Sequence, residues 1–233
     1  MDKLLTGSVK FESVTKKFGQ IVALEDVSFE IGGGEFIFIT GPSGSGKTTI
    51  NKLILREILP TSGSIKIDDI DLVKMPSRKM PQLRRKVGVV FQDFKLLSDR
   101  TVFENVALPL EVIGRGEKEI KQEVGEILSL VGLGERMGLF PAQLAGGELQ
   151  RVCLARAIIA KPEIVLADEP TGNLDPATSW QIVKLLKKIN KMGTTIIMST
   201  HNMEIVNSLR EKVIRIDRGK VVKIEAQGKY EVT

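Results

Sequence analysis

The chain has 233 residues, 42% of them hydrophobic and 27% charged, which is the composition of an ordinary soluble globular protein. Its 34 lysines and arginines exceed its 29 aspartates and glutamates by five, an excess that suits anionic ligands or an anionic membrane surface but does not indicate nucleic-acid binding. One cysteine excludes an internal disulfide framework, and we expect neither a signal segment nor a membrane span, because no run approaches the roughly 18 apolar residues that a span requires.

The first predicted elements are strands over residues 8–11 and 27–31, joined around a turn at residues 17–20. Residues 36–40 (FIFIT) are apolar and rich in β-branched and aromatic residues, which predicts a buried strand. A helix is predicted from Lys47 to about residue 59, because Pro60 follows its last turn. Residues 63–67 and 87–91 are predicted strands, and the basic stretch between them, residues 75–86, is expected to be a solvated face.

From residue 93 to about residue 160 the pattern becomes helical. One helical face carries a stripe of apolar residues at Ile120, Val124, Ile127, Leu128 and Val131. A glycine-rich loop over residues 132–143 precedes a helix over about residues 147–160, inside which Cys153 is expected to pack rather than react.

The last third of the chain returns to alternating elements. Residues 164–167 and 194–199 are predicted buried strands, and Asp175 is predicted to cap a helix that has Pro176 at its first position. Residues 213–216 and 221–224 are expected to form a closing hairpin, and residues 226–233 a loose tail. Strands that alternate with helices predict an α/β fold with a mostly parallel sheet covered on both faces, and the strands at the two ends of the chain suggest an added antiparallel β portion.

The stretch after residues 36–40 matches the phosphate-binding loop G-x-x-x-x-G-K-[ST]. It consists of Gly41, Pro42, Ser43, Gly44, Ser45, Gly46, Lys47, Thr48 and Thr49. Glycines let the backbone N–H groups approach phosphate oxygens, and the following helix adds its positive N-terminal end. Lys47 is expected to contact the β- and γ-phosphates, and the Thr48 hydroxyl to bind Mg²⁺.

Polar residues also follow three other predicted strands, where ligands of open α/β sheets bind. Asp168 can hold Mg²⁺ directly or through water, and Glu169 can orient or deprotonate a water that attacks the γ-phosphate. His201, the only histidine, could contact the γ-phosphate, and Gln92 could bind Mg²⁺ or the attacking water. Plainer interpretations are that the two acids only end a strand and that His201 is structural.

Together these motifs resemble those of the ATP-binding cassette (ABC) ATPase family over nearly the whole chain. In addition to the phosphate loop, Gln92 is similar to the family's Q-loop, Asp168 and Glu169 to its Walker B aspartate and catalytic glutamate, and His201 to its switch histidine. The discriminating piece, which resembles the signature motif, is Leu144, Ala145, Gly146, Gly147 and Glu148. Asp175 resembles the D-loop aspartate, and Phe18 lies where the family has an aromatic residue that stacks on adenine.

The resemblance implies the ABC ATPase fold: one domain in which residues 1–92 and 161–225 form the nucleotide-binding core and residues 93–160 a helical subdomain. It implies ATP and Mg²⁺ as cofactors, with Thr48, Gln92 and Asp168 at the metal, and a head-to-tail ATP-bound dimer in which the signature of one copy completes the ATP site of the other. Ala145 departs from the usual serine, which removes one charge-assisted hydrogen bond of about 1.5–3 kcal/mol to the γ-phosphate. The expected consequence is weaker ATP-driven pairing.

Residues 167–175 (ADEPTGNLD) resemble the branch of the family that serves cell division, lipoprotein release and macrolide export, and residues 91–110 favour the cell-division version. We therefore expect a cytoplasmic ATPase, peripheral on the inner face of the membrane, that drives an integral-membrane partner through about Asp93 to Val112. The alternatives are the ATPase of a lipoprotein-release or export complex, a nucleic-acid-linked ABC protein, and a non-hydrolysing binding module. Glu169 and His201 argue against the last, and no nucleic-acid partner is expected.

Overall fold

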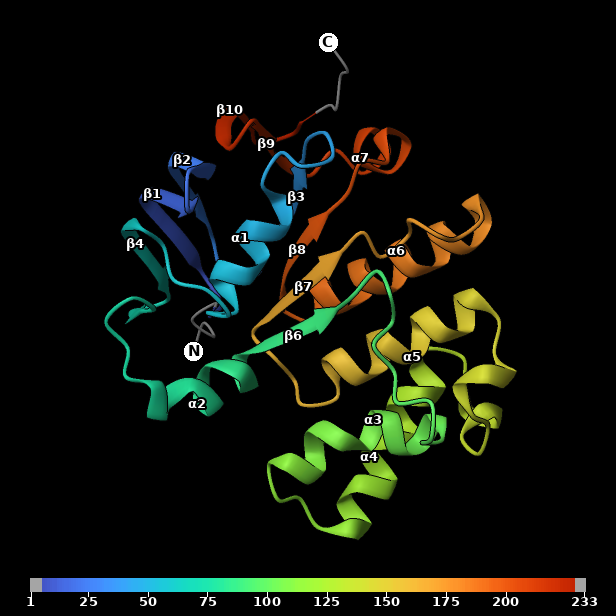
Figure 1. Cartoon of the computed structure of the whole chain (residues 1–233). Coiled ribbons are helices and arrows are strands. Elements are labelled where there is room, and N and C mark those ends of the chain that lie inside the picture. Colours follow the sequence, from blue (N-terminus) through green and yellow to red (C-terminus); the bar gives the residue numbers. More distant parts are fainter. Residues whose placement is uncertain (1–5, 229–233) are drawn as a thin grey trace, which may run out of the picture.

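The computed structural model describes residues 6–228. Figure 1 shows two β-sheets lying one on either side of α1, with a group of helices below the larger sheet. Within the described range, no helix has both the length and the apolarity needed to cross a lipid bilayer.

The larger sheet contains the strands that carry the functional motifs. Its spatial order is β10 (Lys220–Glu225), β9 (Lys212–Asp217), β3 (Phe36–Thr40), β8 (Thr195–Ser199), β7 (Ile164–Asp168) and β6 (Val87–Val90). Neighbouring strands pair in parallel except β10, which pairs antiparallel with β9. Along β3, Ile37 and Ile39 pack into the core on one face, and Phe36 and Phe38 into the core on the other. The predicted α/β fold with a mostly parallel, doubly covered sheet is confirmed.

The smaller sheet is antiparallel, in the order β2 (Ile21–Ile31), β1 (Val9–Phe18), β4 (Ser62–Ile67) and β5 (Ile70–Asp71). The turn between β1 and β2 lies at Gly19 and Gln20, as predicted, but both strands are longer than expected. Their outer halves are mostly exposed and interrupted by register shifts, with left-handed backbone at Ser13 and Asp26. These irregularities break the two-residue hydrophobic period, so the sequence pattern revealed only the buried halves.

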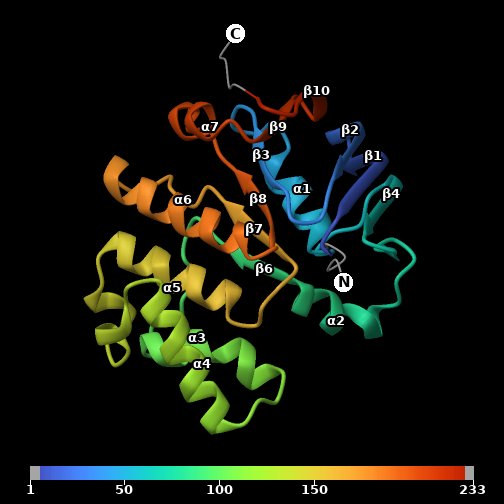
Figure 2. The same cartoon turned by 180° about the vertical axis from the view of Figure 1, so that it is seen from behind.

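Helices cover both faces of the larger sheet. α1 (Lys47–Ile54) lies between the two sheets, whereas α5 (Gly146–Ile158), α6 (Pro176–Lys191) and α7 (Met203–Leu209) lie on the opposite face (Figure 2). α1 ends five residues earlier than predicted, because Arg56 adopts a left-handed backbone with φ of 51°. The prediction also missed α7, which is short and begins where the Asn202 side chain accepts the Ile205 N–H at 3.1 Å.

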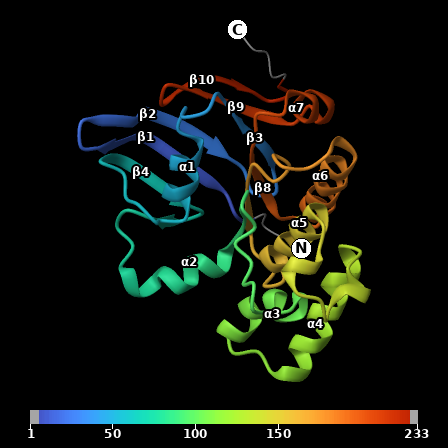
Figure 3. The same cartoon turned by 45° about the vertical axis from the view of Figure 1, so that its right-hand side comes forward.

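A third group of helices packs beside α5, as Figure 3 shows. α3 (Val102–Val112) and α4 (Glu117–Leu130) form an apolar cluster with it, and most of the predicted stripe on α4 is buried there. The predicted helical pattern from residue 93 was wrong for residues 93–101. The buried Asn105 side chain bonds Leu97 N–H and the carbonyls of Leu97, Arg100 and Thr101 at 2.8–3.1 Å, which holds this stretch as a loop.

The remaining helical elements are short. α2 (Met80–Lys86) follows a 3₁₀ turn at Ser77–Lys79, and the predicted loop over residues 132–143 contains 3₁₀ turns at Gly134–Arg136 and Pro141–Gln143. Cys153 is buried, and this burial raises the pKa of its thiol to about 12, which confirms its packing role. Of the predicted loose tail, residues 229–233 lie outside the described residues, whereas Gly228 is anchored by an N–H bond to the Glu211 carbonyl at 3.1 Å.

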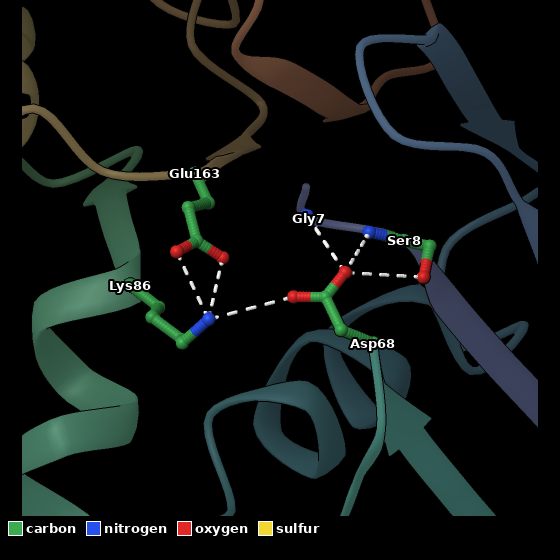
Figure 4. Close-up of polar contacts among 5 residues, drawn as sticks. All are labelled: Gly7, Ser8, Asp68, Lys86 and Glu163. Atoms are coloured by element: carbon green, nitrogen blue, oxygen red, sulfur yellow. Dashed lines mark hydrogen bonds and ion pairs between the residues drawn. The ribbon is translucent and has the colours of Figure 1, made fainter. Parts of the chain in front are cut away.

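A polar network ties the two sheets together at the edge away from the phosphate loop (Figure 4). The Lys86 ammonium, at the end of α2, contacts the Glu163 carboxylate at 2.7 Å and the Asp68 carboxylate at 3.5 Å. The other Asp68 oxygen accepts the N–H groups of Gly7 and Ser8 and the Ser8 hydroxyl, at 2.8, 2.9 and 3.2 Å. Because Glu163 directly precedes β7 and Asp68 follows β4, Lys86 joins the antiparallel sheet to the parallel one.

Candidate active site

The phosphate loop runs from β3 into α1 and is pressed against two other strands. Gly41 has φ of 149°, and a Cβ there would lie 2.0 Å from the Ile216 carbonyl oxygen of β9. Gly46 has φ of 116°, and its Cβ would lie 2.7 Å from the Leu24 side chain of β2. Both positions therefore need glycine for backbone conformation and for space. The loop is thus shaped by its neighbours as well as by its own sequence.

Lys47 is the first residue of α1 and folds back over the loop. Its ammonium donates to the carbonyls of Gly41 at 2.8 Å and Pro42 at 3.0 Å. This places a positive charge beside the N-terminal N–H groups of α1, where the helix dipole also favours an anion. The arrangement is suited to a polyphosphate.

The loop forms one wall of a cavity of about 570 Å³. The residues that line it are Ala23, Ser43, Gly44, Gly46, Lys47, Thr48, Thr49, Gln92, Asp168, Glu169 and His201. The structure therefore brings together most of the predicted phosphate-loop residues and all four polar residues that follow the other strands. Gly41, Pro42 and Ser45 lie outside the lining and shape the loop, since Ser45 is buried and its carbonyl accepts the Gly219 N–H at 2.9 Å.

Asp168 ends β7 on the far wall of the cavity. Burial raises the pKa of its carboxyl, a hydrogen bond from Asn51 opposes the rise, and the Glu169 carboxylate adds to it. Asn51, which the sequence analysis missed, is buried on α1 and also donates to the Ser199 hydroxyl at 3.1 Å. The sequence feature that could have identified Asn51 is a polar residue on the apolar face of the helix predicted after Lys47, one helical turn beyond Lys47. A cation bound here would favour the charged form of Asp168.

Glu169 is held in a strained backbone conformation with φ of 46°, and its N–H donates to the Ser199 carbonyl at 2.9 Å. Its Oε1 lies 3.0 Å from Nδ1 of His201, and its Oε2 is buried without a hydrogen-bond partner in the described structure. A buried carboxylate oxygen with no partner carries a desolvation cost that a water molecule would relieve. The pair can therefore hold a water at the cavity wall and accept its proton.

The signature residues lie apart from this cavity. Ala145 and Gly146 are exposed where α5 begins, and the Glu148 carboxylate accepts the Ala145 N–H at 3.0 Å. A Cβ on Gly147 would lie 2.4 Å from the Thr178 methyl group, so the start of α5 packs tightly on the start of α6. Within one copy of the chain, none of these residues lines the cavity.

Asp175 and Phe18 also lie outside the cavity lining. The Asp175 side chain caps α6 by accepting the Thr178 N–H at 3.0 Å, as predicted, and hydrogen bonds from Thr178 lower the pKa of its carboxyl. Phe18 is half exposed at the tip of the β1–β2 hairpin, with the Lys16 ammonium 4.9 Å from its ring centroid. Its predicted stacking on adenine stays a prediction.

Comparison with known proteins agrees with this geometry. Residues 24–172 match the model of the family described as ABC transporter. The cell division ATP-binding protein FtsE of Bacillus subtilis is 52% identical over 90% of this chain and 92% of its own length. The methionine import ATP-binding protein MetN of Haemophilus influenzae is 42% identical over 92% of this chain but only 64% of its own length.

A solved ATP-binding cassette in a dimeric, post-hydrolysis state bound to ADP and Pi is 38% identical, with a TM-score of 0.86 over 95% of this chain and all of that one. The chain accordingly belongs to the ABC transporter ATPase family, and it is an ATPase that binds and hydrolyses ATP.

Proposed function

We propose that this ATPase acts in cell division by driving an integral-membrane partner that resembles FtsX, and that the complex relays ATP hydrolysis to cell-wall hydrolases. The main support is the similarity to FtsE over nine-tenths of the chain, combined with a cavity lined by phosphate-loop residues, Gln92, Asp168, Glu169 and His201. The protein would work at the inner face of the cell membrane as a peripheral, cytoplasmic subunit. Residues 1–92 and 161–225 would form its nucleotide-binding core, and residues 93–160 its helical subdomain.

The cavity fits Mg·ATP. Thr48, Gln92 and Asp168 supply a hydroxyl, an amide and a carboxylate oxygen to it, and hard oxygen ligands of this kind suit Mg²⁺. The described residues contain no group of three or more metal-binding His, Cys, Asp or Glu side chains, so phosphate oxygens would complete the coordination, as is usual for this ion. Bound there, Mg²⁺ would neutralise charge on the phosphates.

The protein's own groups account for the remaining steps. Lys47 and the N–H groups of the loop and α1 hold the phosphates in place. Glu169 orients the attacking water through its unpartnered Oε2, and His201 fixes the carboxylate through Oε1. Gln92 follows the C-terminal end of β6 and lines the cavity. Loss of the γ-phosphate can therefore change the position of Gln92 and of the residues that follow it.

We further propose that the ATP site is completed by a second copy of the chain. Of the signature residues, Ala145 and Gly146 are exposed, and none of the residues from Ala145 to Glu148 lines the cavity of its own copy, so this end of α5 is available to the cavity of another copy. The dimeric arrangement of the similar cassette supports this inference. ATP would then join two copies head to tail, and hydrolysis would separate them.

Glu169→Gln tests the composite site, because it keeps the shape of the side chain but removes the charge that activates water. We expect ATP hydrolysis to be lost and Mg·ATP to convert monomer to dimer, measured as mass in solution with and without nucleotide. Glu57→Gln, at an exposed position in the turn that follows α1, is the matched control and should hydrolyse ATP normally. A Glu169→Gln variant that stays monomeric at saturating Mg·ATP would contradict ATP-driven pairing of the isolated chain.

The proposed partner surface is the segment from Asp93 to Val112. It borders a groove of about 350 Å³ whose lining includes Arg85, Phe91, Lys95 and Pro109. The Arg156 guanidinium donates to the carbonyls of Lys95 at 2.6 Å and Phe94 at 2.8 Å, which fastens the residues just after Gln92 to α5. A shift of Gln92 can therefore move Phe94 and Lys95, which follow it in the chain, and with them the groove, whose lining includes Lys95 and Arg156.

Leu97→Glu tests this surface. Leu97 is 43% exposed, so a charge there should leave the fold intact but weaken co-purification with the membrane partner at least about tenfold. Val222→Glu, 53% exposed on β10, is the control for a new charge elsewhere. Unchanged partner binding by Leu97→Glu would exclude this part of the segment.

The second candidate function is that of an ATPase subunit in a lipoprotein-release or macrolide-type export complex. Co-purification with a larger permease, together with ATP hydrolysis stimulated by a transported substrate, would favour it. A division defect in cells that carry only the Glu169→Gln variant, without an export defect, would favour the cell-division role.

A further inference from the structure

A hollow of about 360 Å³ lies on the outer surface of α6, where the end of α7 meets it. Its floor is apolar and consists of Trp180, Val183 and Leu209, which also pack against the core of the larger sheet. Its rim consists of Lys184, Lys187, Lys188 and Lys191. We call this feature the lysine hollow. It lies outside the ATP cavity and outside the proposed partner surface.

The charge of the lysine hollow is largely uncompensated. Among residues 6–228, Lys187 forms an ion pair with Glu211, whereas the exposed Lys184, Lys188 and Lys191 pair with no carboxylate. Lys184 and Lys188 are four residues apart on one helical face, a spacing at which like charges repel each other. An anion bound between them would relieve this repulsion.

Helix electrostatics explain only part of the cluster. Lys188 and Lys191 lie in the last turn of α6, where positive charge is favourable because of the helix dipole. Lys184 lies farther from that end, and the dipole does not account for an apolar floor beside it. A combination of uncompensated lysines and an apolar hollow is instead complementary to a ligand that carries both negative charge and an apolar group.

We infer that the lysine hollow binds an acidic segment of a partner protein, with one apolar side chain against Trp180 and carboxylates on the rim lysines. A peptide is favoured over a lipid surface because the apolar part is concave and can receive a protruding side chain. Membrane-surface helices instead insert their own apolar side chains into the lipid. Lys184, Lys188 and Lys191, unpaired within residues 6–228, would attract the negative charge of the partner segment, and the apolar floor would receive its apolar side chain.

The position of Trp180 gives the site a route to the ATPase centre. On its other side Trp180 lines a smaller cavity of about 170 Å³, together with Glu169 and His201. A ligand bound in the lysine hollow would therefore contact Trp180, which also lines the small cavity that contains Glu169 and His201. Trp180 is also the only tryptophan in the chain, so its fluorescence reports directly on the hollow.

The test is a titration of the full chain, without nucleotide, with a synthetic peptide in which aspartates flank a central pair of leucines. We expect saturable binding by fluorescence anisotropy of the labelled peptide and a parallel change in Trp180 emission. The Lys184→Glu/Lys188→Glu variant should weaken binding at least about tenfold, or about 1.4 kcal/mol. The matched control, Lys118→Glu/Lys121→Glu, makes the same change of net charge at exposed positions of α4 and should bind like the unaltered chain.

Four results would overturn the inference. The first is no change in Trp180 emission at saturating peptide, and the second is an equal loss of affinity in both double variants, which would indicate general charge attraction. The third is binding to vesicles of anionic phosphatidylglycerol, but not to the peptide, that depends on Lys184 and Lys188. A peptide in which serines replace the leucines should bind more weakly, and equal binding, the fourth result, would exclude the apolar floor as part of the site.

Discussion

Replacing Ala145 by serine should stabilise the folded chain even without nucleotide. Ala145 is the N-cap residue of α5, with extended backbone angles of φ −70° and ψ 158°. The Glu148 carboxylate already accepts the Ala145 N–H at 3.0 Å, which is one half of a capping box. Alanine has no side-chain acceptor for the Glu148 N–H, so the other half is missing.

The size of the effect follows from this geometry. A serine hydroxyl in place of alanine at an N-cap contributes about 0.5–2 kcal/mol, and the exposure of this position favours the lower half of that range. For a chain of this length each kcal/mol raises the melting temperature by about 2–4 °C, so we expect an increase of about 1–5 °C. No backbone change is needed, because serine favours the angles that Ala145 already has.

The measurement is thermal unfolding followed by circular dichroism, without ATP or Mg²⁺. Ala142→Ser, an exposed alanine in the preceding 3₁₀ turn, is the control and should change stability by no more than about 0.5 kcal/mol. An unchanged or lower melting temperature for Ala145→Ser would refute the capping argument. If Ala145→Ser also strengthens ATP-driven pairing of the Glu169→Gln variant, the hydroxyl has a second role at the composite site.

Two further predictions concern the network that joins the sheets. Lys86→Met removes the cation between Glu163 and Asp68, each less than a third exposed, and should lower the free energy of unfolding by about 1–2 kcal/mol, measured by thermal unfolding. Lys74→Met, the control at an exposed ion pair, should lower it by almost nothing. Equal effects of the two variants would contradict the role of Lys86 in joining the sheets. Burial alone would raise the pKa of Asp68, but hydrogen bonds from Ser8 and Gly7 and the Lys86 charge together lower it. A lowered pKa stabilises the fold at pH values above the pKa of Asp68 in the unfolded chain, which is about 4. The advantage of the unaltered chain over Asp68→Asn should therefore be full at neutral pH, begin to fall near pH 4, and disappear only when the pH is below the lowered pKa of Asp68 in the folded chain. A difference that persists at lower pH would show that the Asp68 charge is not its source.

Much of the active site could be predicted from sequence because its residues lie within short, locally defined motifs. The phosphate loop has its glycines and Lys47 within one strand-to-helix turn, and the parallel strands carry Asp168, Glu169 and His201 to the same edge. The apolar runs of β7 and β8 and the N-cap at Asp175 are also local signals, and the structure confirms them. For these features the sequence alone determined the outcome.

Tertiary structure decided whatever depends on residues distant in the chain. Residues 93–101 form a loop because one buried side chain, that of Asn105, bonds to them from α3. The outer halves of β1 and β2 pair although several of their side chains are exposed and their register shifts. Asn51 of α1 bonds Asp168 of β7, a residue far away in the sequence. The lysine hollow exists because α7, too short to be recognised in the sequence, brings Leu209 against α6. Local patterns record the conformation of a segment, but a contact between segments arises only when the chain has folded, since it depends on both partners at once.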